Sequence, residues 1–279
     1  MRIFGVVVLY HPPPDLERNI RSYLDAIDQL LVIDNTSPSV INDVQAKLPL
    51  GRVQWRVNNE NEGIAKPWND AAKWAMEQGA DWLLVMDQDS LFRENVGATW
   101  QQFLANNQVA SVAVIAPVHQ TDASQEIKKT PGTTRLNFVM GSGCLINLGA
   151  YRASGPFNEK LFLDLVDHEY CLRVRKQGYS VLRMNEVILQ HRLGERVNIG
   201  TRAAVRHAPI RKYYRSRNRL LVMFNYFFFD PFYFLFEVKS ALMDVVKILV
   251  LENEKKKNLW YFFLGVWHAV TRKYGRLRS

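Results

Sequence analysis

Short apolar runs alternate with amphipathic stretches over the first 117 residues of the chain. Runs typical of β-strands occupy residues 4–10, 29–35, 52–57, 81–87 and 111–117. Between them, apolar side chains recur at helical spacing over 15–28, 64–80 and 93–106, and a Ser-Pro signal indicates a short helix over 38–47. Asp15 is expected to cap the first helix, and Gly79 to end the helix that contains Pro67 in its first turn.

This alternation predicts an α/β fold with a mostly parallel sheet and helices on both faces. Ligands of such sheets bind at the carboxyl ends of the strands. Two acids stand at predicted strand ends, Asp34 after LLVI and Asp87 after WLLVM, which indicates a site at one edge of the sheet. An Asp at the end of a strand also caps the following turn, and for Asp34 alone both interpretations stay open.

The pattern changes after residue 117. Residues 118–135 are polar and predict a loop, and β character resumes over 135–151 around a Gly-Ser-Gly. A helix with an acidic start and a basic end is expected over 163–179, stopping at Gly178. Two short strands, YSVLRM and EVILQH, are expected to follow.

The segment LLVMDQDS (83–90) takes an apolar strand directly into two carboxylates, Asp87 and Asp89. Residues i and i+2 of a strand point to the same side, so both acids are expected to face one cavity and Gln88 to turn away. A hard divalent cation, Mg²⁺ or Mn²⁺, relieves the repulsion between them. Because Mg²⁺ usually takes its other ligands from water and phosphate, the pair predicts a metal–diphosphate site. A D-x-D motif alone often occurs by chance. Its position at the end of a predicted strand makes the motif in this chain better evidence for a metal site.

A second acidic cluster comprises Asp164, Asp167 and Glu169. If the helix begins at Leu163, then Asp164 and Asp167 share one face at i, i+3. Acids also favour a helix N-terminus for its dipole, but three of them beside the apolar LFLDLV favour a chemical role, such as a general base. His191 ends a predicted strand and is either a structural residue or a third metal ligand.

Composition and charge limit the function classes. The 279 residues are 48% hydrophobic, and two cysteines are too few for a disulfide framework, so a reducing compartment is expected. The apolar run before His11 is shorter than the ~7–15 residues of a signal peptide, and no export is expected. Residues 1–190 carry a net charge of −3 and residues 191–279 one of +12, which predicts an anionic partner for the C-terminal third.

Several short sequence blocks lie across residues 1–220. Their order and spacing together are more specific than any single block. They are VVLYHP (7–12), VIDNTS (32–37), NENEGIAKPWNDA (59–71), LLVMDQDS (83–90), GSGCLI (141–146), FNEKLFLDLVDHEYCLRVRKQGY (157–179), HRLG (191–194) and RKYYRSRNRL (211–220). In these blocks the chain resembles the inverting family 2 glycosyltransferases of the GT-A fold, and most of all bacterial rhamnosyltransferases of O-antigen and related polysaccharide synthesis. The resemblance implies a Rossmann-like catalytic domain over 1–205 and a C-terminal helical region over 206–279.

The resemblance also implies a donor-binding role for several positions. Asp87 would contact the ribose or the metal, and Asp89 and His191 would coordinate the metal. The pocket for the nucleotide base and ribose would be lined by Tyr10, Asp34, Asn61, Gly63 and Lys66.

Asp167 falls where the family has its catalytic base, and Glu169 follows it. The family has an acid just before the base, where this chain has Val166, so Asp164 is a candidate for part of that role. The implied reaction is a metal-dependent transfer with inversion, in which the base takes the proton of an acceptor hydroxyl that attacks C1 of the donor. The implied donor is dTDP-rhamnose, and a UDP-sugar is the alternative. A sugar-phosphate nucleotidyltransferase is a further alternative, but it normally has a basic, glycine-rich loop where this chain has HPPPD.

The C-terminal region is basic and aromatic. Its run LLVMFNYFFF is shorter than the ~20 residues that span a bilayer, which indicates interfacial helices with shallowly inserted aromatic rings beside Lys and Arg. The alternative is a helical subdomain that packs on the catalytic core or in a homodimer. The implied acceptor is a polyprenyl-diphosphate-linked glycan, whose diphosphate would meet Arg211, Lys212, Arg215 and Arg217. The expected location is therefore the cytoplasmic face of the bacterial inner membrane. Nucleic acid is not expected as a partner, because the aromatic residues do not alternate with Arg.

Overall fold

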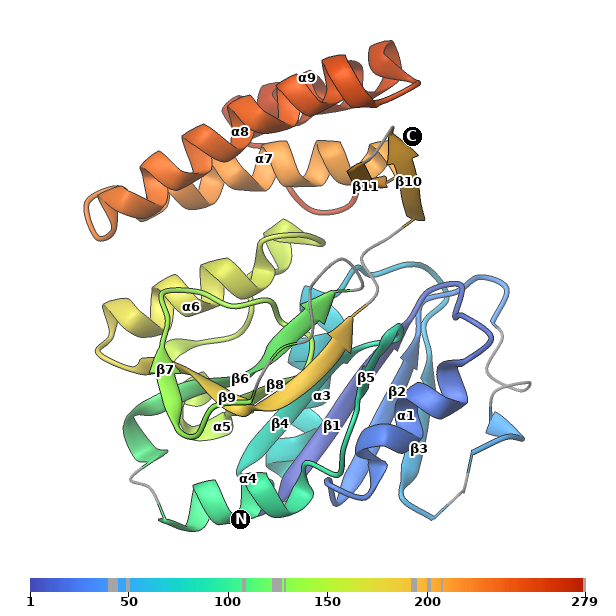
Figure 1. The fold of residues 1–279 in the computed structure, drawn as a ribbon, viewed down its shortest axis with the longest axis vertical. Coiled ribbons are helices and arrows are strands. Elements are labelled where there is room, and N and C mark those ends of the chain that lie inside the picture. Colours follow the sequence, from blue (N-terminus) through green and yellow to red (C-terminus); the bar gives the residue numbers. More distant parts are fainter. Residues whose placement is uncertain are drawn as a thin grey trace. The chain divides into compact units, whose positions relative to one another are not determined.

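The computed structural model describes residues 1–39, 45–48, 51–106, 109–121, 127, 129–191, 195–199, 202–206 and 208–277. The chain divides into two compact units (Figure 1). Unit 1 comprises Met1–Phe157 and Tyr170–Arg192, and unit 2 comprises Asn158–Glu169 and Leu193–Ser279. The C-terminal unit therefore includes a short stretch from the middle of the chain, Asn158–Glu169.

Unit 1 is built on a sheet with the strand order β3-β2-β1-β4-β8-β6-β9-β5, and β7 pairs with β9. The strands are β1 (Ile3–Leu9), β2 (Gln29–Asp34), β3 (Val53–Val57), β4 (Trp82–Asp87), β5 (Ser90–Phe92), β6 (Val112–Thr121), β7 (Thr133–Arg135), β8 (Cys144–Asn147) and β9 (Ser180–His191). From β3 to β4 the sheet is parallel, as predicted. Beyond β4 it is mixed, because β8 runs antiparallel to both of its neighbours.

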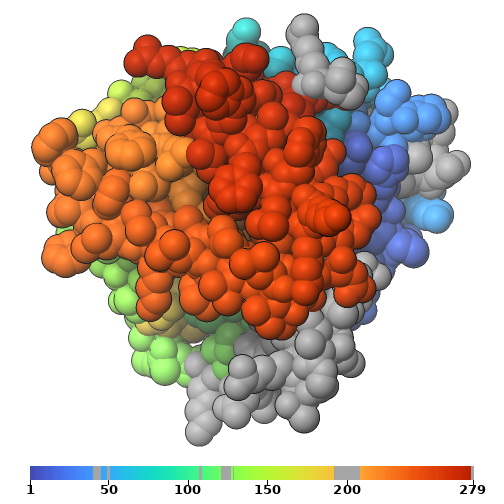
Figure 2. Space-filling view, turned by 90° about the horizontal axis from the view of Figure 1, so that it is seen from above, coloured from blue at the N-terminus to red at the C-terminus, as the bar shows by residue number. Residues whose placement is uncertain are grey.

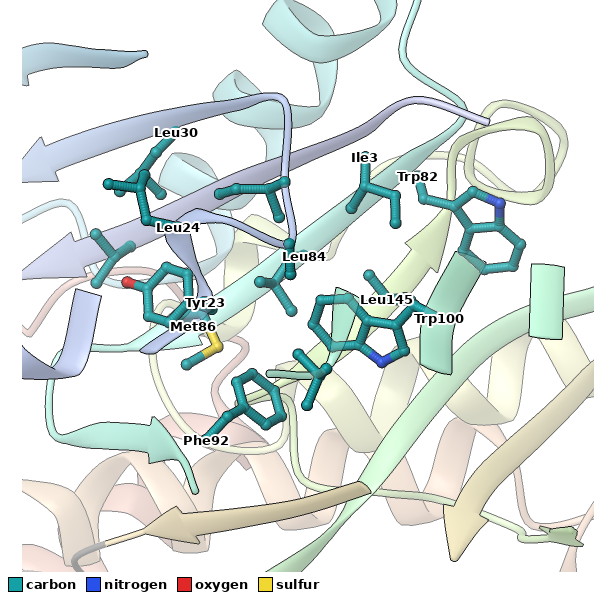
Figure 3. Close-up of a cluster of buried hydrophobic side chains, with 14 of the residues drawn as sticks. Ile3, Tyr23, Leu24, Leu30, Trp82, Leu84, Met86, Phe92, Trp100 and Leu145 are labelled. Carbon is teal, nitrogen blue, oxygen red and sulfur yellow. The ribbon is translucent and has the colours of Figure 1, made fainter. Parts of the chain in front are cut away.

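Helices cover both faces of this sheet. They are α1 (Leu16–Leu24), α3 (Ala65–Glu77), α4 (Gly97–Asn106), α5 (Leu148–Ser154) and α6 (Val166–Lys176), of which α6 begins in unit 2. On one face, Tyr23 of α1 and Trp100 of α4 join Leu84 and Met86 of β4 in a buried cluster (Figure 3). On the other face, the ring centroid of Phe4 lies 4.9 Å from that of Trp74 on α3. The sheet is thus buried on both sides, as its nearly continuous apolar strands require.

The boundaries of α1 and α3 test three predicted signals. Asp15 occupies the N-cap position of α1, but its side chain makes no hydrogen bond to the first turn. Pro67 does lie in the first turn of α3, and Gly79 follows the helix with a φ of 74°, a conformation that favours glycine. The short helix expected over 38–47 falls mostly outside the described residues.

The prediction of two strands after Gly178 is wrong. Residues 180–191 form one strand, β9, which pairs with β6 along most of its length. A register shift in that pairing, between Ala116 and Val118, accommodates the polar residues in the middle of β9. The loop predicted over 118–135 is also shorter than expected, because β6 continues to Thr121 and β7 begins at Thr133.

Unit 2 combines the stretch Asn158–Glu169 with a hairpin and a group of helices. These elements are β10 (Glu195–Ile199), β11 (Arg202–Arg206), α7 (Pro209–Asn225), α8 (Pro231–Leu251) and α9 (Lys255–Val270). α7 and α9 lie in close contact at Gly265, where an added Cβ would lie 2.1 Å from Ser216 Oγ. Within the described part of the chain, no helix is both long enough and apolar enough to cross a membrane.

Candidate active site

Two strand ends of unit 1 bring three potential metal ligands together. Asp87 is the last residue of β4, and Asp89 lies in the two-residue turn that leads into β5. β5 pairs antiparallel with β9, and this register places His191 opposite Ser90. One ligand atom from each of Asp87, Asp89 and His191 lies within 4.8 Å of the other two. The predicted pair of acids and the predicted histidine therefore do form one cluster.

This cluster fits a divalent cation. It offers two carboxylates and one imidazole, a donor set that suits Mg²⁺ or Mn²⁺. His191 Nδ1 lies 3.6 Å from Asp89 Oδ1, so the two side chains converge on the same small volume. A hard cation would take its remaining ligands from water or from a phosphate group, which leaves room for a substrate.

The hydroxyl groups of Ser90 and Ser142 form hydrogen bonds with residues of the Asp87, Asp89 and His191 cluster. Ser90 Oγ lies 2.6 Å from His191 Nδ1, and Ser142 Oγ donates a hydrogen bond of 2.9 Å to Ser90 Oγ. Ser142 Oγ also accepts from the backbone N–H of Asp87 at 3.1 Å. The carbonyl oxygen of Ser142 lies 2.7 Å from His119 Nε2. These side chains hold the ligands in place, and fixed outer partners of this kind typically raise metal affinity.

No sequence pattern predicted a role for these supporting residues. Ser90 lies inside the DQDS motif, and Ser142 lies between two glycines that the sequence does mark. A Cβ at Gly141 would come within 2.5 Å of Trp68, and one at Gly143 within 2.8 Å of Leu189. Gly-Ser-Gly therefore lets the backbone carry the Ser142 hydroxyl into a tightly packed position. His119 has no comparable signal in the sequence.

Tyr10 and Gln88 join the end of β1 to the acidic turn. The Tyr10 N–H donates to Gln88 Oε1, and Gln88 Nε2 donates to the Tyr10 carbonyl, both at 2.9 Å. The Tyr10 side chain is 49% exposed, so its ring is available to a ligand. Gln88 therefore fixes the backbone at Tyr10, just after the end of β1.

The contacts of Asp34 agree with its alternative interpretation as a turn cap, and its role in the donor pocket stays a prediction. Asp34 is fully buried, and its oxygens accept hydrogen bonds from the Thr36 N–H at 2.8 Å and from Ser39 Oγ at 2.7 Å. It therefore caps the turn after β2, which was the alternative interpretation.

The loop through Asn61 and Gly63 is tied to the end of β2 by amide side chains. Asn35 Nδ2 donates to the Gly63 carbonyl at 2.7 Å, and Asn58 Nδ2 donates to Asn35 Oδ1 at 2.8 Å. Asn61 Oδ1 accepts from the Gly63 N–H at 2.8 Å, and Gly63 has a φ of 74°. Asn61 and Gly63 thus shape a turn at the same carboxyl edge of the parallel strands.

Lys66 follows this turn in the first turn of α3. Its Nζ lies 2.7 Å from Glu62 and 3.2 Å from Asp70. Burial alone would lower the pKa of Lys66, but the two carboxylates raise it above its ordinary value. Lys66 is therefore a fixed positive charge, with 37% of its side chain exposed.

The second acidic cluster lies in unit 2 and is not the continuous helix that was expected. α6 begins at Val166, and Asp164 precedes it with a φ of 60°. Asp164 forms an ion pair of 2.6 Å with Arg211. Asp167 lies in the first turn of α6, is partly exposed, and accepts a hydrogen bond from the His168 N–H at 2.9 Å. Glu169 is buried and accepts from Tyr226 Oη at 2.7 Å. Asp164 and Glu169 therefore form contacts within unit 2, and the acceptor-facing role of these two acids stays a prediction.

Two of the four predicted diphosphate-binding cations have partners within unit 2. Arg217 is fully buried and bonded to backbone carbonyls, and Lys212 forms a 2.5 Å ion pair with Glu252 at 13% side-chain exposure. These contacts occupy both side chains within unit 2, and their binding of a diphosphate stays a prediction. Arg211 and Arg215 keep 44% and 43% of their side chains exposed.

A model of the family described as "Glycosyl transferase family 2" matches residues 6–154, more than half of the chain. The chain belongs to glycosyl transferase family 2. The matched region contains most of β1, the strands β2 to β4 and the turn with Asp87 and Asp89. The protein is accordingly a glycosyltransferase, as the resemblance implied.

Known proteins agree with this family assignment. The glycosyltransferase is 27% identical over 238 residues to the dTDP-rhamnosyl transferase RfbF of Shigella flexneri, covering 79% of each chain. Its fold is similar to the crystal structure of S. aureus TarS 1-349, with a TM-score of 0.58, 14% identity and coverage of 97% and 81% of the two chains. It is also similar to the crystal structure of GalNAc-T7 with UDP, GalNAc and Mn2+, with a TM-score of 0.61, 12% identity and coverage of 98% and 58%. At these identities the structural neighbours show a shared GT-A fold and no more.

Proposed function

We propose that this glycosyltransferase moves L-rhamnose from dTDP-rhamnose to an acceptor hydroxyl with inversion of the anomeric configuration. The observation that carries the proposal is the cluster of Asp87, Asp89 and His191 at the carboxyl end of β4, whose ligand atoms lie within 4.8 Å of one another. A metal–diphosphate site is what a nucleoside-diphosphate donor requires. The choice of sugar and base is supported by the relative named as a dTDP-rhamnosyl transferase.

Different residues of unit 1 would bind different parts of the donor. Asp87, Asp89 and His191 would hold the divalent cation, which supplies neutralisation of the charge on the departing diphosphate. The exposed ring of Tyr10 offers a surface to the base, and the Asn61–Gly63 turn gives the ribose a rigid boundary. Lys66 contributes a lasting positive charge near this edge.

Asp167 is proposed as the base that removes the proton from the acceptor hydroxyl. That oxygen then attacks C1 of the donor from the face opposite the departing diphosphate, so a β-linked rhamnose gives an α-linkage. The partial exposure of Asp167 leaves its carboxylate accessible to an acceptor. Asp164 and Glu169, held by Arg211 and Tyr226, serve to shape this turn instead.

A donor screen tests the proposal. The full chain is incubated with dTDP-L-rhamnose, UDP-glucose and UDP-N-acetylglucosamine, with Mg²⁺, Mn²⁺ or EDTA, and release of the nucleoside diphosphate is measured. Release from dTDP-L-rhamnose alone, abolished by EDTA, is expected. Preference for a UDP-sugar would overturn the donor, and activity in EDTA would overturn the metal dependence.

Two variants separate the proposed roles. Asp167→Asn is expected to abolish turnover while dTDP still binds, because the base does not hold the donor. Asp89→Ala is expected to remove both turnover and the dependence of dTDP binding on Mn²⁺. Glu159→Gln, an exposed acid in the same stretch as Asp167, is the matched control and is expected to keep wild-type activity.

The acceptor is proposed to be a polyprenyl-diphosphate-linked glycan at an anionic membrane surface, for which unit 2 has a suitable face. α8 carries a stripe of exposed apolar residues at helical spacing, and α9 carries a second one. Figure 2 shows these two helices in orange and red. Their exposed members are Phe232, Leu235, Phe236, Leu242, Met243, Val246, Leu249 and Val250 on α8, and Trp260, Phe263, Trp267 and Val270 on α9. Phe232 is 80% exposed, so these stripes present large apolar side chains to solvent.

Basic residues accompany these stripes, which favours an anionic lipid surface over a second copy of this basic chain. Lys239 and Lys247 are exposed on α8, and Lys255, Lys256 and Lys257 are exposed at the start of α9. Each such charge contributes about 1 kcal/mol near an anionic membrane. Membrane attachment of this kind would place the enzyme on the inner face of the cytoplasmic membrane, in O-antigen or related polysaccharide synthesis.

Vesicle flotation tests this surface. Binding is expected to vesicles that contain phosphatidylglycerol, to weaken with salt, and to fall at least about tenfold in a Phe232→Ser, Trp267→Ser double variant. Asn253→Ser, on the same exposed surface, is the control. Unchanged vesicle binding by the double variant would overturn the assignment of this surface as the membrane-binding one. A dimeric wild type and a monomeric double variant in light scattering would show instead that the surface forms a homodimer.

A further inference from the structure

The backbone just before α6 adopts a conformation that bulky residues rarely take. Phe162, Asp164 and Leu165 have φ values of 64°, 60° and 63°. A positive φ is a strained conformation for L-residues with a side chain. The segment ends two residues before Asp167, so whatever holds it also fixes the start of the helix that carries Asp167.

α7 supplies the groups that hold this segment. Asn218 is fully buried, and its Nδ2 donates to the carbonyls of Leu161, Leu163 and Asp164 at 2.9, 2.6 and 2.8 Å. An amide has only two N–H bonds, so one of them is shared between two carbonyls. One side chain thus gathers three carbonyls of the strained turn.

Arg217, next to Asn218, also donates hydrogen bonds to this segment. Its guanidinium donates to the Leu161 carbonyl at 2.9 Å, to the Lys160 carbonyl at 3.1 Å and to the Gly275 carbonyl at 2.6 Å. It lies 5.2 and 5.1 Å from the ring centroids of Tyr213 and Tyr214, whose π faces favour a cation. Two adjacent, buried side chains of α7 therefore bind the backbone carbonyls of the turn before α6.

The residues on the C-terminal side of Asp167 are anchored as well. Tyr226, which follows α7, donates to Glu169, and His168 Nδ1 lies 3.4 Å from Tyr233 Oη and 3.7 Å from Glu237 Oε1 on α8. The backbone of Asp167 is consequently fixed from both sides, by α7 before it and by α7 and α8 after it.

We propose that Asn218 is a positioning residue for Asp167, and that α7 is thereby part of the catalytic apparatus. This inference rests on the proposed role of Asp167 as the base. Loss of the Asn218 amide releases three carbonyls and lets the turn relax toward ordinary φ values, which moves the Asp167 carboxylate. A displacement of about 1 Å at a catalytic group can lower the rate about 100-fold.

The test compares Asn218→Ala with Ser216→Ala in the full chain. Ser216 is equally buried on the same helix, but its hydroxyl bonds to the Phe262 and Tyr213 carbonyls and not to the turn. With dTDP-L-rhamnose as donor and water as acceptor, Asn218→Ala is expected to lower kcat about 10- to 100-fold, to shift the acid limb of the kcat–pH profile and to leave the Kd of dTDP within twofold. Ser216→Ala is expected to keep the wild-type kcat and pH profile.

Hydrogen–deuterium exchange provides a readout that needs no turnover. Asn218→Ala is expected to speed exchange in peptides covering residues 158–169, and Ser216→Ala is not. If Asn218→Ala folds poorly, Tyr226→Phe, which removes one hydroxyl from Glu169, is expected to lower kcat severalfold with the fold intact.

The outcomes distinguish this inference from the proposed function. Equal loss of kcat in Asn218→Ala and Ser216→Ala, or faster exchange with an unchanged kcat and pH profile, overturns the positioning role. Wild-type turnover in Asp167→Asn instead overturns the role of Asp167 itself. An inactive Asp167→Asn with a fully active Asn218→Ala leaves the base in place and rejects Asn218.

Discussion

Replacing Glu237 with glutamine removes one charge from a buried cluster while nearly keeping the side-chain volume. Glu237 Oε2 pairs with Arg219 at 2.8 Å, and both side chains are 2% exposed. Arg219 also pairs with Asp244 at 2.8 Å, so it keeps one partner in Glu237→Gln. The variant therefore measures what the Glu237 charge contributes without leaving a cation alone in the core.

The size of the effect follows from the pKa of Glu237. Burial alone would raise this pKa, but hydrogen bonds and charges from His168 and Arg219 outweigh burial and hold the pKa at about 2, against an ordinary 4.5. A carboxyl whose pKa is lower in the folded state stabilises that state above its unfolded pKa and loses the contribution as pH falls through its folded pKa. At 1.36 kcal/mol per unit, the contribution is about 3 kcal/mol at pH 7 and about 2 kcal/mol at pH 3.5.

Urea unfolding followed by tryptophan fluorescence measures this contribution. The free energy of unfolding of Glu237→Gln is expected to be lower than that of the wild type by about 3 kcal/mol at pH 7, with a gap that narrows by about a third at pH 3.5. Glu254→Gln, whose partner Lys257 is exposed, serves as the control and is expected to change stability by less than about 1 kcal/mol. A gap below about 1 kcal/mol at pH 7, or one that does not narrow in acid, would refute the electrostatic argument.

Three further predictions concern packing and the metal cluster. Gly265→Ala is expected to lower the melting temperature of the protein, because its Cβ would lie 2.4 Å from the Tyr213 carbonyl, and overpacking of this kind costs about 1–3 kcal/mol; an unchanged melting temperature would contradict the close contact of α7 and α9. Trp100→Ala is expected to cost about 3–5 kcal/mol in urea unfolding, since Trp100 is 2% exposed in the core of unit 1, and a loss under 1 kcal/mol would show that the core refills. Ser142→Ala is expected to weaken Mn²⁺ binding about 10-fold or more in titration calorimetry with dTDP present, while equal affinity would show that the hydroxyl network does not hold the ligands.

The local patterns of the sequence predict unit 1 well, because its strands and helices are specified by periodicity and by strand-end chemistry. The strand pattern correctly places Asp87 at the end of β4, but the turn that leads into β5 brings Asp89 beside it, and His191 joins them through the pairing of β5 with β9. Asp34 shows the limit of this reasoning. Whether a strand-end acid faces a ligand or caps its own turn depends on the position of Ser39 and Thr36, which no periodicity describes.

The C-terminal helices are predicted less well, because tertiary contacts decide which charges are buried. In RKYYRSRNRL the arginines look alike, yet Arg211 is exposed while Arg217 is buried against carbonyls some 57 residues earlier in the chain. The predicted start of the helix near Asp164 is wrong for a related reason. A helix starting at Leu163 is locally reasonable, but the bonds from Arg217 and Asn218 to the preceding turn favour a helix that starts at Val166.

The membership of Asn158–Glu169 in unit 2 has a consequence for protein engineering. A fragment that stops near residue 205 would contain every motif of the N-terminal sheet, and Asp167 as well, but not the helix that holds the turn before it. Such a truncated enzyme is expected to bind nucleotide and yet to transfer sugar poorly. For the same reason, a chimera that exchanges C-terminal helices between two relatives must exchange residues 158–169 together with them, since the inherited module is interrupted in sequence.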